Sequence, residues 1–346
     1  MRRSVQCMTV ALGLAVAGAV SAQSDVAQIP YEAEDALSGF PEDVYLGEVA
    51  GVARNSRGEI FVYTRTGNPT LSLGTTRYMS HGGSRIFKFD SRGRYEREIG
   101  QNMYGALFAQ QARVDDDDNL WVVDQMSGQV VRFDSQARIT MVLSRKPESM
   151  RLPAGEPGPG RVREGESFNA PTDVAWDSEG NIYVVDGLYN SRIAKYEPNG
   201  RFVANYGEDG MGRGQFNGIH GLAIDGQDRL YVADYGNERI QVLDTNGNFI
   251  REIDGIGAPM AICITPGPNQ MLYVSNSNPP DNIDVAGEIY EVRLDGTVTG
   301  RFGRAGKRIG EFGTVNAIDC RDPSDLLVGE VGNWRVQSVH LRPAQQ

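Results

Sequence analysis

The feature that most constrains this fold is a segment of similar pattern that recurs six times along the 346-residue chain. Two copies are plain: "TDVAWDSEGNIYVVDGLYNSRIAKYEPNGRFVANYG" begins at Thr172, and "HGLAIDGQDRLYVADYGNERIQVLDTNGNFIREI" begins at His220. Related segments begin at Ala50, Gln111, Met260 and Asn316. A unit that recurs in this way buries its apolar surface against its neighbours instead of folding alone.

Each unit contains four short runs in which apolar and polar residues alternate, which is typical of half-buried β-strands. Tight polar turns such as "DSEGN" and "EPNGR" separate the runs, and Asp, Asn and Gly tolerate the positive φ of hairpin turns. The spacing of about 53 residues suits a propeller blade. We therefore predict an all-β, six-bladed β-propeller of four-stranded antiparallel blades over residues 44–342. The last unit lacks a clear fourth strand, and the N-terminal segment 23–43 is expected to supply it.

The first 22 residues predict a secretory signal peptide, because Arg2 and Arg3 precede a short apolar run and small residues end at Ala22. We expect cleavage near Ala22 and export of the mature chain, periplasmic or secreted, without insertion into the membrane. Removing the two arginines changes the net charge from −11 to −13. This acidic balance argues against nucleic acid as a partner.

The mature chain keeps two cysteines, Cys263 and Cys320. An exported compartment would permit a disulfide between them. Their positions within their repeats differ by one residue, however, and on neighbouring strands this offset would direct the side chains to opposite faces. The pattern therefore favours two separate thiols, with pairing left open.

Strand geometry places the start of each first strand and the end of each second strand on one side of the disc. We call this side the loop face, because it carries the insertions Thr66–Ser84, Ser144–Ser167 and Ser277–Gly287. The opposite side, the turn face, carries only short turns. Long loops gathered on one rigid rim favour a binding site there.

Two rings of residues are expected at the loop face. The first strands would begin there with Ala50, Gln110, Thr172, His220, Met260 and Asn316, and the second strands would end there with Thr64, Asp124, Asp186, Asp234, Asn276 and Glu330. Arg65, Tyr189 and Tyr235 follow closely. The recurring acids are interpreted first as acceptors for backbone N–H groups of the next loop; the alternative is an acidic funnel for cations or amines. The run Asp115–Asn119, "DDDDN", is interpreted as a solvated turn, with a calcium loop as the alternative.

The wording of "GQFNGIHGLAIDGQDRLYVADYGNERIQVLD" resembles the NHL repeat, and "FVYTRT" and "PTDVAWDSEGNIYVVDGLYNSRI" resemble blades of the peptidyl-α-hydroxyglycine α-amidating lyases. The resemblance implies a zinc enzyme that splits a hydroxyglycine into an amide and glyoxylate, with zinc held by three histidines. His220 matches one ligand and Arg65 a functional arginine. The other matched positions depart from the family. Gln110 and Asn316 replace zinc-binding histidines, and Ala317 replaces an aspartate. Leu188 occupies the position of the catalytic tyrosine, with Tyr189 next to it, and Tyr235 replaces an arginine.

Catalytic zinc needs three protein ligands with an open fourth position, and uncharged amides are weak zinc ligands. We therefore expect His220 to line a pocket, with a metal role as the lesser alternative; His81 in the first insertion is a reserve ligand.

The favoured function is an exported propeller that binds a small molecule, peptide or protein at the loop face, with Arg65 pairing a carboxylate and His220, Tyr189 and Tyr235 completing the site. A scaffold whose rim recruits partner proteins, with no pocket chemistry, is a further interpretation.

The alternative is a metal-dependent enzyme. It would be either a zinc-containing amidating lyase or a lactone hydrolase of the gluconolactonase kind, and the candidates for catalytic roles are Arg65, Tyr189 and Tyr235. A gluconolactonase-like site would hold calcium through oxygen ligands. Its ligand candidates are Asp186, Asp234, Asn276, Asn316 and Glu330.

Overall fold

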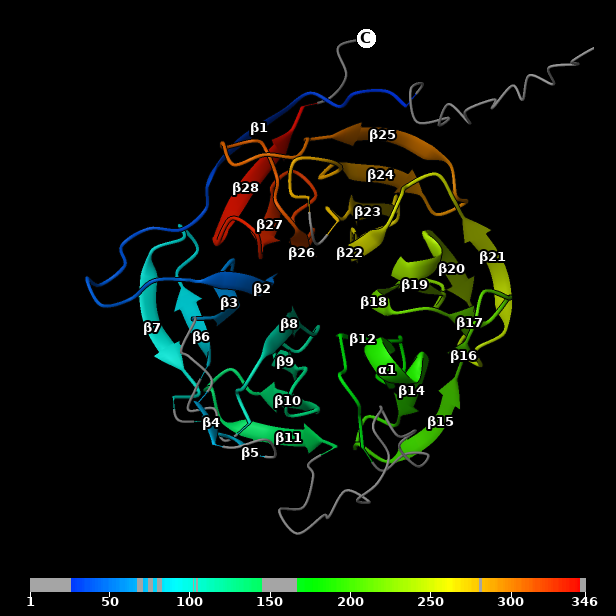
Figure 1. Cartoon of the computed structure of the whole chain (residues 1–346), viewed down its shortest axis with the longest axis horizontal. Coiled ribbons are helices and arrows are strands. Elements are labelled where there is room, and N and C mark those ends of the chain that lie inside the picture. The colour runs from blue at the N-terminus through cyan, green and yellow to red at the C-terminus, as the bar shows by residue number, and fades with distance from the viewer. Residues whose placement is uncertain are drawn as a thin grey trace, which may run out of the picture.

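The computed structural model describes residues 26–66, 71–73, 77–79, 83–101, 103, 105–144, 167–279 and 282–342. The expected signal peptide, His81 and most of the insertion between blades two and three lie outside these residues. Six four-stranded antiparallel sheets stand around a central axis (Figure 1). The predicted six-bladed β-propeller is therefore confirmed.

Each blade is described from the axis outward. Blade 1 comprises β2 (Glu48–Arg54), β3 (Ile60–Arg65), β6 (Ser84–Phe89) and β7 (Tyr95–Ile99); blade 2 comprises β8 (Ala109–Val114), β9 (Leu120–Asp124), β10 (Gln129–Phe133) and β11 (Ile139–Leu143). Blade 3 comprises β12 (Asp173–Trp176), β13 (Ile182–Asp186), β14 (Arg192–Tyr196) and β15 (Phe202–Tyr206); blade 4 comprises β18 (Ile219–Ile224), β19 (Leu230–Asp234), β20 (Arg239–Leu243) and β21 (Phe249–Ile253). Blade 5 comprises β22 (Pro259–Ile264), β23 (Met271–Asn276), β24 (Ile289–Arg293) and β25 (Val298–Phe302).

Blade 6 closes the ring with strands from both ends of the chain. Its inner strands are β26 (Val315–Asp319), β27 (Leu326–Glu330) and β28 (Arg335–Leu341), and its outermost strand is β1 (Tyr31–Asp35). β1 pairs antiparallel with β28, from Tyr31 opposite Leu341 to Asp35 opposite Gln337. Because β1 precedes blade 1 in the chain, this pairing ties the last blade to the first and closes the ring.

Small elements decorate the connections. Two-stranded pairs form between β4 (Leu71–Leu73) and β5 (Arg77–Met79), and between β16 (Glu208–Asp209) and β17 (Gln215–Phe216). The short helix α1 (Gly187–Asn190) follows β13, and the 3-10 turn η2 (Tyr235–Asn237) follows β19. Both begin where a second strand ends at the loop face, so they shape the rim.

The apolar core lies between adjacent blades. The second strands are buried on both faces, and in β9, β13, β19 and β27 every residue is buried. Large side chains such as Tyr63, Trp121, Tyr183 and Tyr231 fill the wedges between sheets. This packing explains the repeat, because each blade needs a neighbour on either side to bury its apolar faces.

A buried ion pair occupies the axis. Arg113 of β8 binds Asp173 of β12 in a bidentate manner, with Nε to Oδ1 at 2.9 Å and Nη2 to Oδ2 at 2.6 Å. The same guanidinium donates to the carbonyl of Ile262 at 3.0 Å, and more weakly to that of Ile318 at 3.4 Å. The carboxylate also accepts the backbone N–H of Leu222 at 2.9 Å. One pair thus joins the inner strands of blades 2, 3, 4, 5 and 6.

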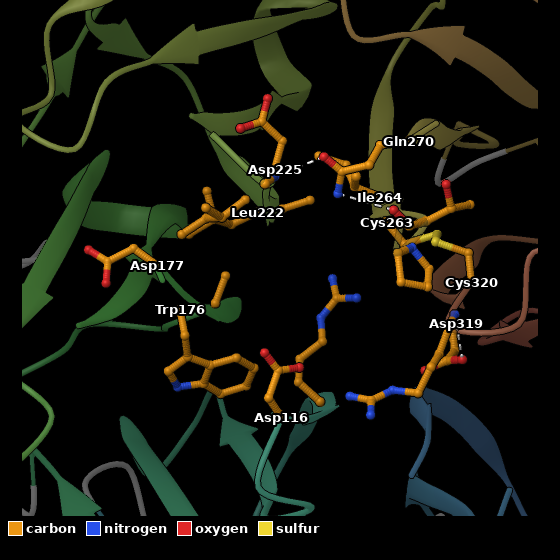
Figure 2. A pocket seen from close by; sticks show the side chains of 18 of the residues that line it. Asp116, Trp176, Asp177, Leu222, Asp225, Cys263, Ile264, Gln270, Asp319 and Cys320 are labelled. Atoms are coloured by element: carbon orange, nitrogen blue, oxygen red, sulfur yellow. Dashed lines mark hydrogen bonds between the residues drawn. A yellow bond between two sulfur atoms is a disulfide. The ribbon is translucent and has the colours of Figure 1, made fainter. Parts of the chain in front are cut away.

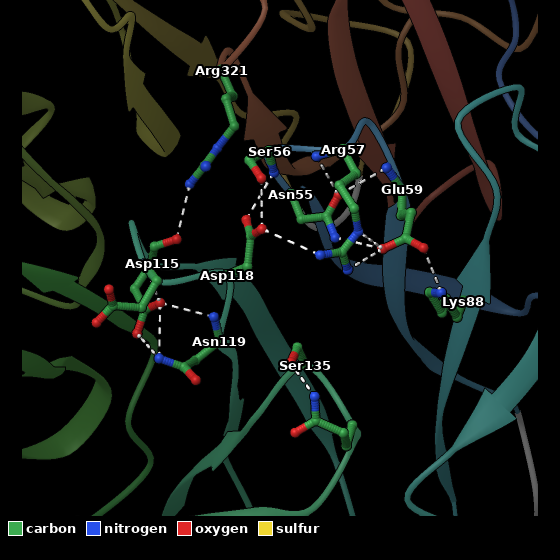
Figure 3. A network of polar contacts seen from close by, with 12 residues as sticks. Asn55, Ser56, Arg57, Glu59, Lys88, Asp115, Asp118, Asn119, Ser135 and Arg321 are labelled. Atoms are coloured by element: carbon green, nitrogen blue, oxygen red, sulfur yellow. Dashed lines mark hydrogen bonds and ion pairs between the residues drawn. The ribbon is translucent and has the colours of Figure 1, made fainter.

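Hydrogen bonds between neighbouring turns stiffen the turn face. Asp118 in the "DDDDN" turn accepts bonds from the backbone N–H and hydroxyl of Ser56 in blade 1 (Figure 3). Asp228 of blade 4 holds Ser178 of blade 3 in the same manner. Asp115 accepts the N–H groups of Asp117 and Asn119 within its own turn. These aspartates therefore shape and join turns, in keeping with the turn interpretation.

The expectation of separate thiols is wrong: Cys263 and Cys320 form a disulfide with a Cα–Cα distance of 6.1 Å. The register argument applies to strands that pair within one sheet. Cys263 lies in β22 and Cys320 directly follows β26, which are the inner strands of two separate sheets packed face to face. Side chains that meet across such a gap leave opposite faces of their sheets, so the offset of one residue brings the sulfurs together.

Breaking the axial pair should cost much stability. Arg113→Met leaves Asp173 charged and fully buried, and we expect the free energy of unfolding to fall by about 3–5 kcal/mol. The double variant Arg113→Met/Asp173→Asn should recover part of this loss, since it removes the stranded charge. Urea unfolding of the variants measures both effects. The exposed pair Arg138–Asp134 is the matched control, and Arg138→Met should leave the midpoint unchanged. An unaltered midpoint in Arg113→Met would contradict this role.

Candidate functional site: the loop face of the propeller

The tunnel mouth at the loop face gathers polar side chains from blades 1, 2 and 4. Arg65 ends β3, Gln110 lies at the start of β8 and His220 lies at the start of β18. The Nη2 of Arg65 donates to Oε1 of Gln110 at 2.9 Å, and Nε2 of Gln110 lies 3.4 Å from Nδ1 of His220. These three residues, distant in sequence, form one chain of polar contacts across the mouth.

Arg65 is held by several partners besides Gln110. Its Nε donates to the carbonyl of Ala109 at 2.7 Å and its Nη1 to Oε2 of Glu48 at 3.0 Å. Its guanidinium carbon lies 3.8 Å from the ring centroid of Phe108, a cation–π contact. The expected partner for a ligand carboxylate is therefore fixed in place, and Glu48 already supplies a carboxylate.

His220 is a neutral imidazole with a defined tautomer. Burial at the mouth, with the charge of Arg65 nearby, lowers its pKa to about 4. Because Oε1 of Gln110 accepts from Arg65, its amide nitrogen faces Nδ1 of His220 as a donor, so Nδ1 accepts and Nε2 carries the proton. Tyr235 packs edge-on against the ring at 5.7 Å between centroids. The site thus presents a neutral N–H donor beside an aromatic ring.

Asn316 and Thr172 join the inner strands at the same level. The amide of Asn316 donates to the carbonyls of Ala50 at 2.6 Å and Gln110 at 2.8 Å. The hydroxyl of Thr172 donates to the carbonyl of Ile219 at 3.2 Å. Both side chains are buried and their polar groups are engaged by backbone. They set the width of the mouth.

The carboxylates that end the second strands are buried and paired. Asp186 binds Arg192, Asp234 binds Arg239 and Glu330 binds Arg335, with all three acids shielded from solvent. Their other oxygens accept backbone N–H groups of the preceding connection: Asn169 for Asp186, Asn217 for Asp234 and Gly313 for Glu330. Asp124 accepts the N–H groups of Leu107 and Phe108. These contacts match the structural interpretation of the acids.

Asn276 serves its loop in a related way. Its Oδ1 accepts the N–H of Ala258 at 3.1 Å, and its Nδ2 donates to Glu288 at 3.0 Å. Tyr189, by contrast, lies in α1 with 54 % of its surface exposed, and Leu188 beside it is also exposed. Of the expected ligand-binding residues, Tyr189, Tyr235, His220 and Arg65 are those that reach the surface of the loop face.

The donor set at this mouth does not fit a catalytic zinc. Among the residues that the structure describes here, only His220 offers an imidazole, and its Nδ1 accepts from Gln110 while its Nε2 carries a proton. The oxygen of Gln110 is bound by Arg65, and Asn316 directs its amide nitrogen to two carbonyls. Within the described ranges, no three His, Cys, Asp or Glu side chains are grouped as a metal site would require. The chain's own polar groups thus satisfy one another where the lyase family would place its metal ligands.

Exposed apolar side chains are concentrated on the loop face, a pattern that the repeat alignment did not reveal. Twelve large ones are exposed among the described residues. Eight lie in connections at the loop face: Tyr45, Met126, Leu188, Tyr189, Met211, Val285, Ile309 and Trp334. The other four, Ile139, Val142, Val203 and Ile250, lie in outermost strands, so none belongs to the turns of the turn face. The sequence contains this pattern, because most of the eight residues lie in connections that follow a second or a fourth strand, and these connections are on the loop face.

A cavity of about 450 Å³ lies at the opposite mouth, on the turn face (Figure 2). Arg113 lines it and lies in β8 between the loop-face start of that strand and the turn, so the axial ion pair lies between the cavity and the loop-face mouth. The repeat alignment gives no sign of it, since its walls come from five different blades. The two mouths of the tunnel are thus two distinct surfaces.

None of the helices in the described part of the chain is long and apolar enough to cross a bilayer.

Comparison with known proteins places the chain among NHL propellers. Residues 216–243 match the family model described as NHL repeat. The chain is 30 % identical over 234 residues to peptidyl-glycine alpha-amidating monooxygenase B of Xenopus laevis, covering 65 % of this chain and 24 % of that protein. It is 26 % identical over 328 residues to peptidyl-alpha-hydroxyglycine alpha-amidating lyase 1 of Drosophila melanogaster, covering 87 % and 56 %. The chain therefore spans about a quarter of the frog protein and just over half of the fly protein.

Solved structures share the fold at low identity. A gluconolactonase from Xanthomonas campestris aligns with a TM-score of 0.59 and 13 % identity, over 92 % of this chain and 95 % of that one. A streptogramin B lyase structure aligns with a TM-score of 0.57 and 12 % identity, over 90 % and 98 %. These similarities support the architecture alone.

The pKa of His220 gives a prediction for stability against pH. An unfolded histidine titrates near 6.5, and the folded residue near 4, so the unfolded state binds more protons between these values. The contribution of neutral His220, about 1–3 kcal/mol, is full above pH 6.5 and is lost as pH falls toward 4. The difference in unfolding free energy between wild type and His220→Gln, measured by urea titration from pH 8 to about 4, should shrink accordingly. A difference independent of pH would contradict the desolvated imidazole.

The repeat, the homology and the fold point the same way, and they confirm the resemblance drawn from the sequence. The matched relatives align along most of the propeller, and the solved structures align along nearly all of it. The chain is a six-bladed NHL-repeat β-propeller homologous to the peptidyl-glycine α-amidating monooxygenases and amidating lyases.

Proposed function

We propose that this chain is an exported binding protein whose loop face takes a peptide, without the zinc chemistry of the amidating lyases. The carrying observation is the placement of exposed apolar side chains: they gather on the loop face and on outer strands, and the described turns of the other face have none. Exposed aromatic residues around a polar centre are characteristic of recognition surfaces. A small molecule or a whole protein domain at this face would be the outcome if peptides fail to bind.

The centre of this surface suits the polar end of a peptide. Neutral His220 offers an N–H donor, and the ring of Tyr235 stands beside it. Arg65 can pair with a peptide carboxylate when Glu48, whose side chain is 38 % exposed, turns away. Glu48 thus occupies the position at Arg65 that the carboxylate of the peptide would take. Peptidyl substrates in the names of the relatives support this choice of ligand class.

Export is supported by two features of the chain. The predicted signal peptide over residues 1–22 lies outside the described residues. The Cys263–Cys320 disulfide is a bond that persists in oxidising compartments and is rare in the reducing cytosol. We therefore propose that the mature protein is periplasmic or secreted.

A metal-dependent enzyme is the second candidate, because the homologues named as amidating lyases align along most of this chain. Its zinc form lacks two imidazoles, as Gln110 and Asn316 are committed to Arg65 and to backbone carbonyls. Its calcium form would draw on Asp186, Asp234 and Glu330, whose carboxylates are buried against arginines. The donor chemistry therefore favours binding over catalysis.

Zinc content separates the two candidates. Wild type should bind no stoichiometric zinc and release no glyoxylate from a short peptide that ends in α-hydroxyglycine. The double variant Gln110→His/Asn316→His, which restores a three-imidazole set, should gain zinc, measured by elemental analysis after dialysis against the metal. Stoichiometric zinc in wild type that is lost in His220→Ala, together with glyoxylate release, would establish the enzyme instead.

Peptide binding tests the surface itself. Glycine-extended peptides ending in a free carboxylate, and their amidated forms, are titrated by calorimetry. We expect Tyr189→Ser/Trp334→Ser to weaken binding by about tenfold, and Glu48→Gln to tighten binding of the carboxylate form selectively. The matched control is Val203→Ser/Ile250→Ser, which removes exposed apolar side chains from outer strands. Equal loss in both double variants, or no selectivity in Glu48→Gln, would contradict a peptide site at the loop face.

A further inference from the structure

The cavity on the turn face has the size of a ligand site. Its volume is about 450 Å³, within the range of small-molecule pockets. Its walls come from the inner strands and adjoining turns of blades 2 to 6. Hydrogen bonds between turns, such as those of Asp228 to Ser178 and of Gln270 to the N–H of Gly226, hold its rim. The cavity is therefore preformed in a rigid frame.

The lining of the cavity mixes apolar and acidic side chains. Leu222 and Ile264 lie across the opening from Trp176 and Asp116, and Asp319 lies beside the disulfide (Figure 2). Five aspartates and two arginines are among the lining residues: Asp116, Asp177, Asp225, Asp228, Asp319, Arg113 and Arg321. The excess of three acids makes the interior favourable for positive charge.

Most of these charges are already satisfied by protein groups. Arg113 is bound by Asp173, Asp225 by Arg229, and Asp228 by Ser178. Asp177 accepts the hydroxyl of Tyr183 at 2.9 Å. Arg321 reaches from blade 6 to the carbonyl of Val114 at 2.8 Å. These groups fix the shape of the cavity and leave little capacity for a ligand.

Asp319 and Asp116 are different. Asp319 accepts only backbone N–H groups, from Arg54 at 3.0 Å and Arg321 at 3.2 Å, and forms no ion pair within the described residues. The charges of Arg54 and Arg321 favour ionised Asp319, yet neither guanidinium forms an ion pair with it. Arg54 pairs with Asp325, and Arg321 donates to the carbonyls of Val114 and Asp115. Asp116 is exposed on the rim and has no hydrogen-bond partner in the described part of the chain. Two carboxylates of the lining thus remain available.

Burial adds to this argument, because desolvation raises the pKa of Asp319. A carboxylate that is desolvated without an ion-pair partner carries an energetic penalty that an added cation would relieve. The apolar side chains of the cavity would at the same time shield a hydrocarbon body from water.

We propose that the turn-face cavity is a second binding site, for a small organic cation that carries a protonated amine on an apolar body. The amine pairs with Asp319, the exposed carboxylate of Asp116 adds longer-range attraction from the rim, and the body packs against Leu222 and Ile264. This site and the loop face lie at opposite ends of the inner strands, with the Arg113–Asp173 pair between them. A ligand at one mouth therefore has no contact with a ligand at the other.

Three probes with the same ring but different charge test the proposal: phenethylamine, 2-phenylethanol and 3-phenylpropanoate. The chain has three tryptophans. Trp176 lines the cavity, and the ring of Trp121 packs against the ring of Trp176. Trp334 is exposed on the loop face. Fluorescence of the Trp334→Phe protein therefore reports on the cavity side, and calorimetry provides the second measure. We expect phenethylamine to bind at least about tenfold more tightly than the other two probes.

Variants locate the site. Asp319→Asn should raise the Kd of phenethylamine by about tenfold, and Asp116→Asn by a smaller factor, because its charge is exposed. Ile264→Trp fills the cavity and should abolish binding. His220→Gln, at the opposite mouth, is the matched control and should bind normally. Because Asp116 is exposed, its variant keeps the test valid even where Asp319→Asn does not fold.

Three results would overturn the proposal. The first is equal affinity for the amine, the alcohol and the acid, which would remove the role of charge. The second is unchanged binding in both Asp116→Asn and Ile264→Trp, or loss of binding in His220→Gln, which would move the site elsewhere. The third is the absence of a saturable response to phenethylamine up to about 10 mM, a concentration above any useful affinity. None of these results bears on peptide binding at the loop face, so the two proposals fail separately.

Discussion

A single buried ion pair sets the plan of this molecule. Arg113 and Asp173 meet on the axis, and their remaining hydrogen-bonding groups contact backbone from three further blades. A largely buried charge pair is stable only when its groups are engaged, and here the ring of inner strands supplies the partners. The pair fixes the blades relative to one another, and it lies between the two mouths of the tunnel. Two chemically different surfaces thus lie on opposite sides of the disc.

The repeated acids show how much of a repeat serves architecture. Asp186, Asp234 and Glu330 hold the connections of their blades through buried bonds to backbone and arginine. A residue that recurs in unit after unit answers a need common to those units. Function is therefore expected where the units differ, as at Arg65, Gln110 and His220, which form one polar chain only because three blades meet at the mouth.

The repeat explains why the fold was predictable and the sites less so. Alternation, turn residues and spacing specify each blade and even the supply of the last strand by the N-terminal segment. They say nothing about contacts between blades. The disulfide was judged by rules for strands within a sheet, and the cavity is built by five sheets at once. Arg113 is a charged residue where other blades carry Ala175 or Ala223, yet its partner Asp173 could be named only with the ring closed.

The closure by β1 and β28 has a consequence for synthesis. β1 leaves the ribosome first and its partner last, since Tyr31 pairs with Leu341. Until β28 has been synthesised, the backbone groups of β1 that will pair with it remain open, and such unpaired strands are sites at which chains aggregate. Its sequence, "YEAED", carries three carboxylates in five residues, which deter pairing with other chains through charge repulsion. The acids of β1 thus reduce aggregation of the nascent chain before β28 is available to pair.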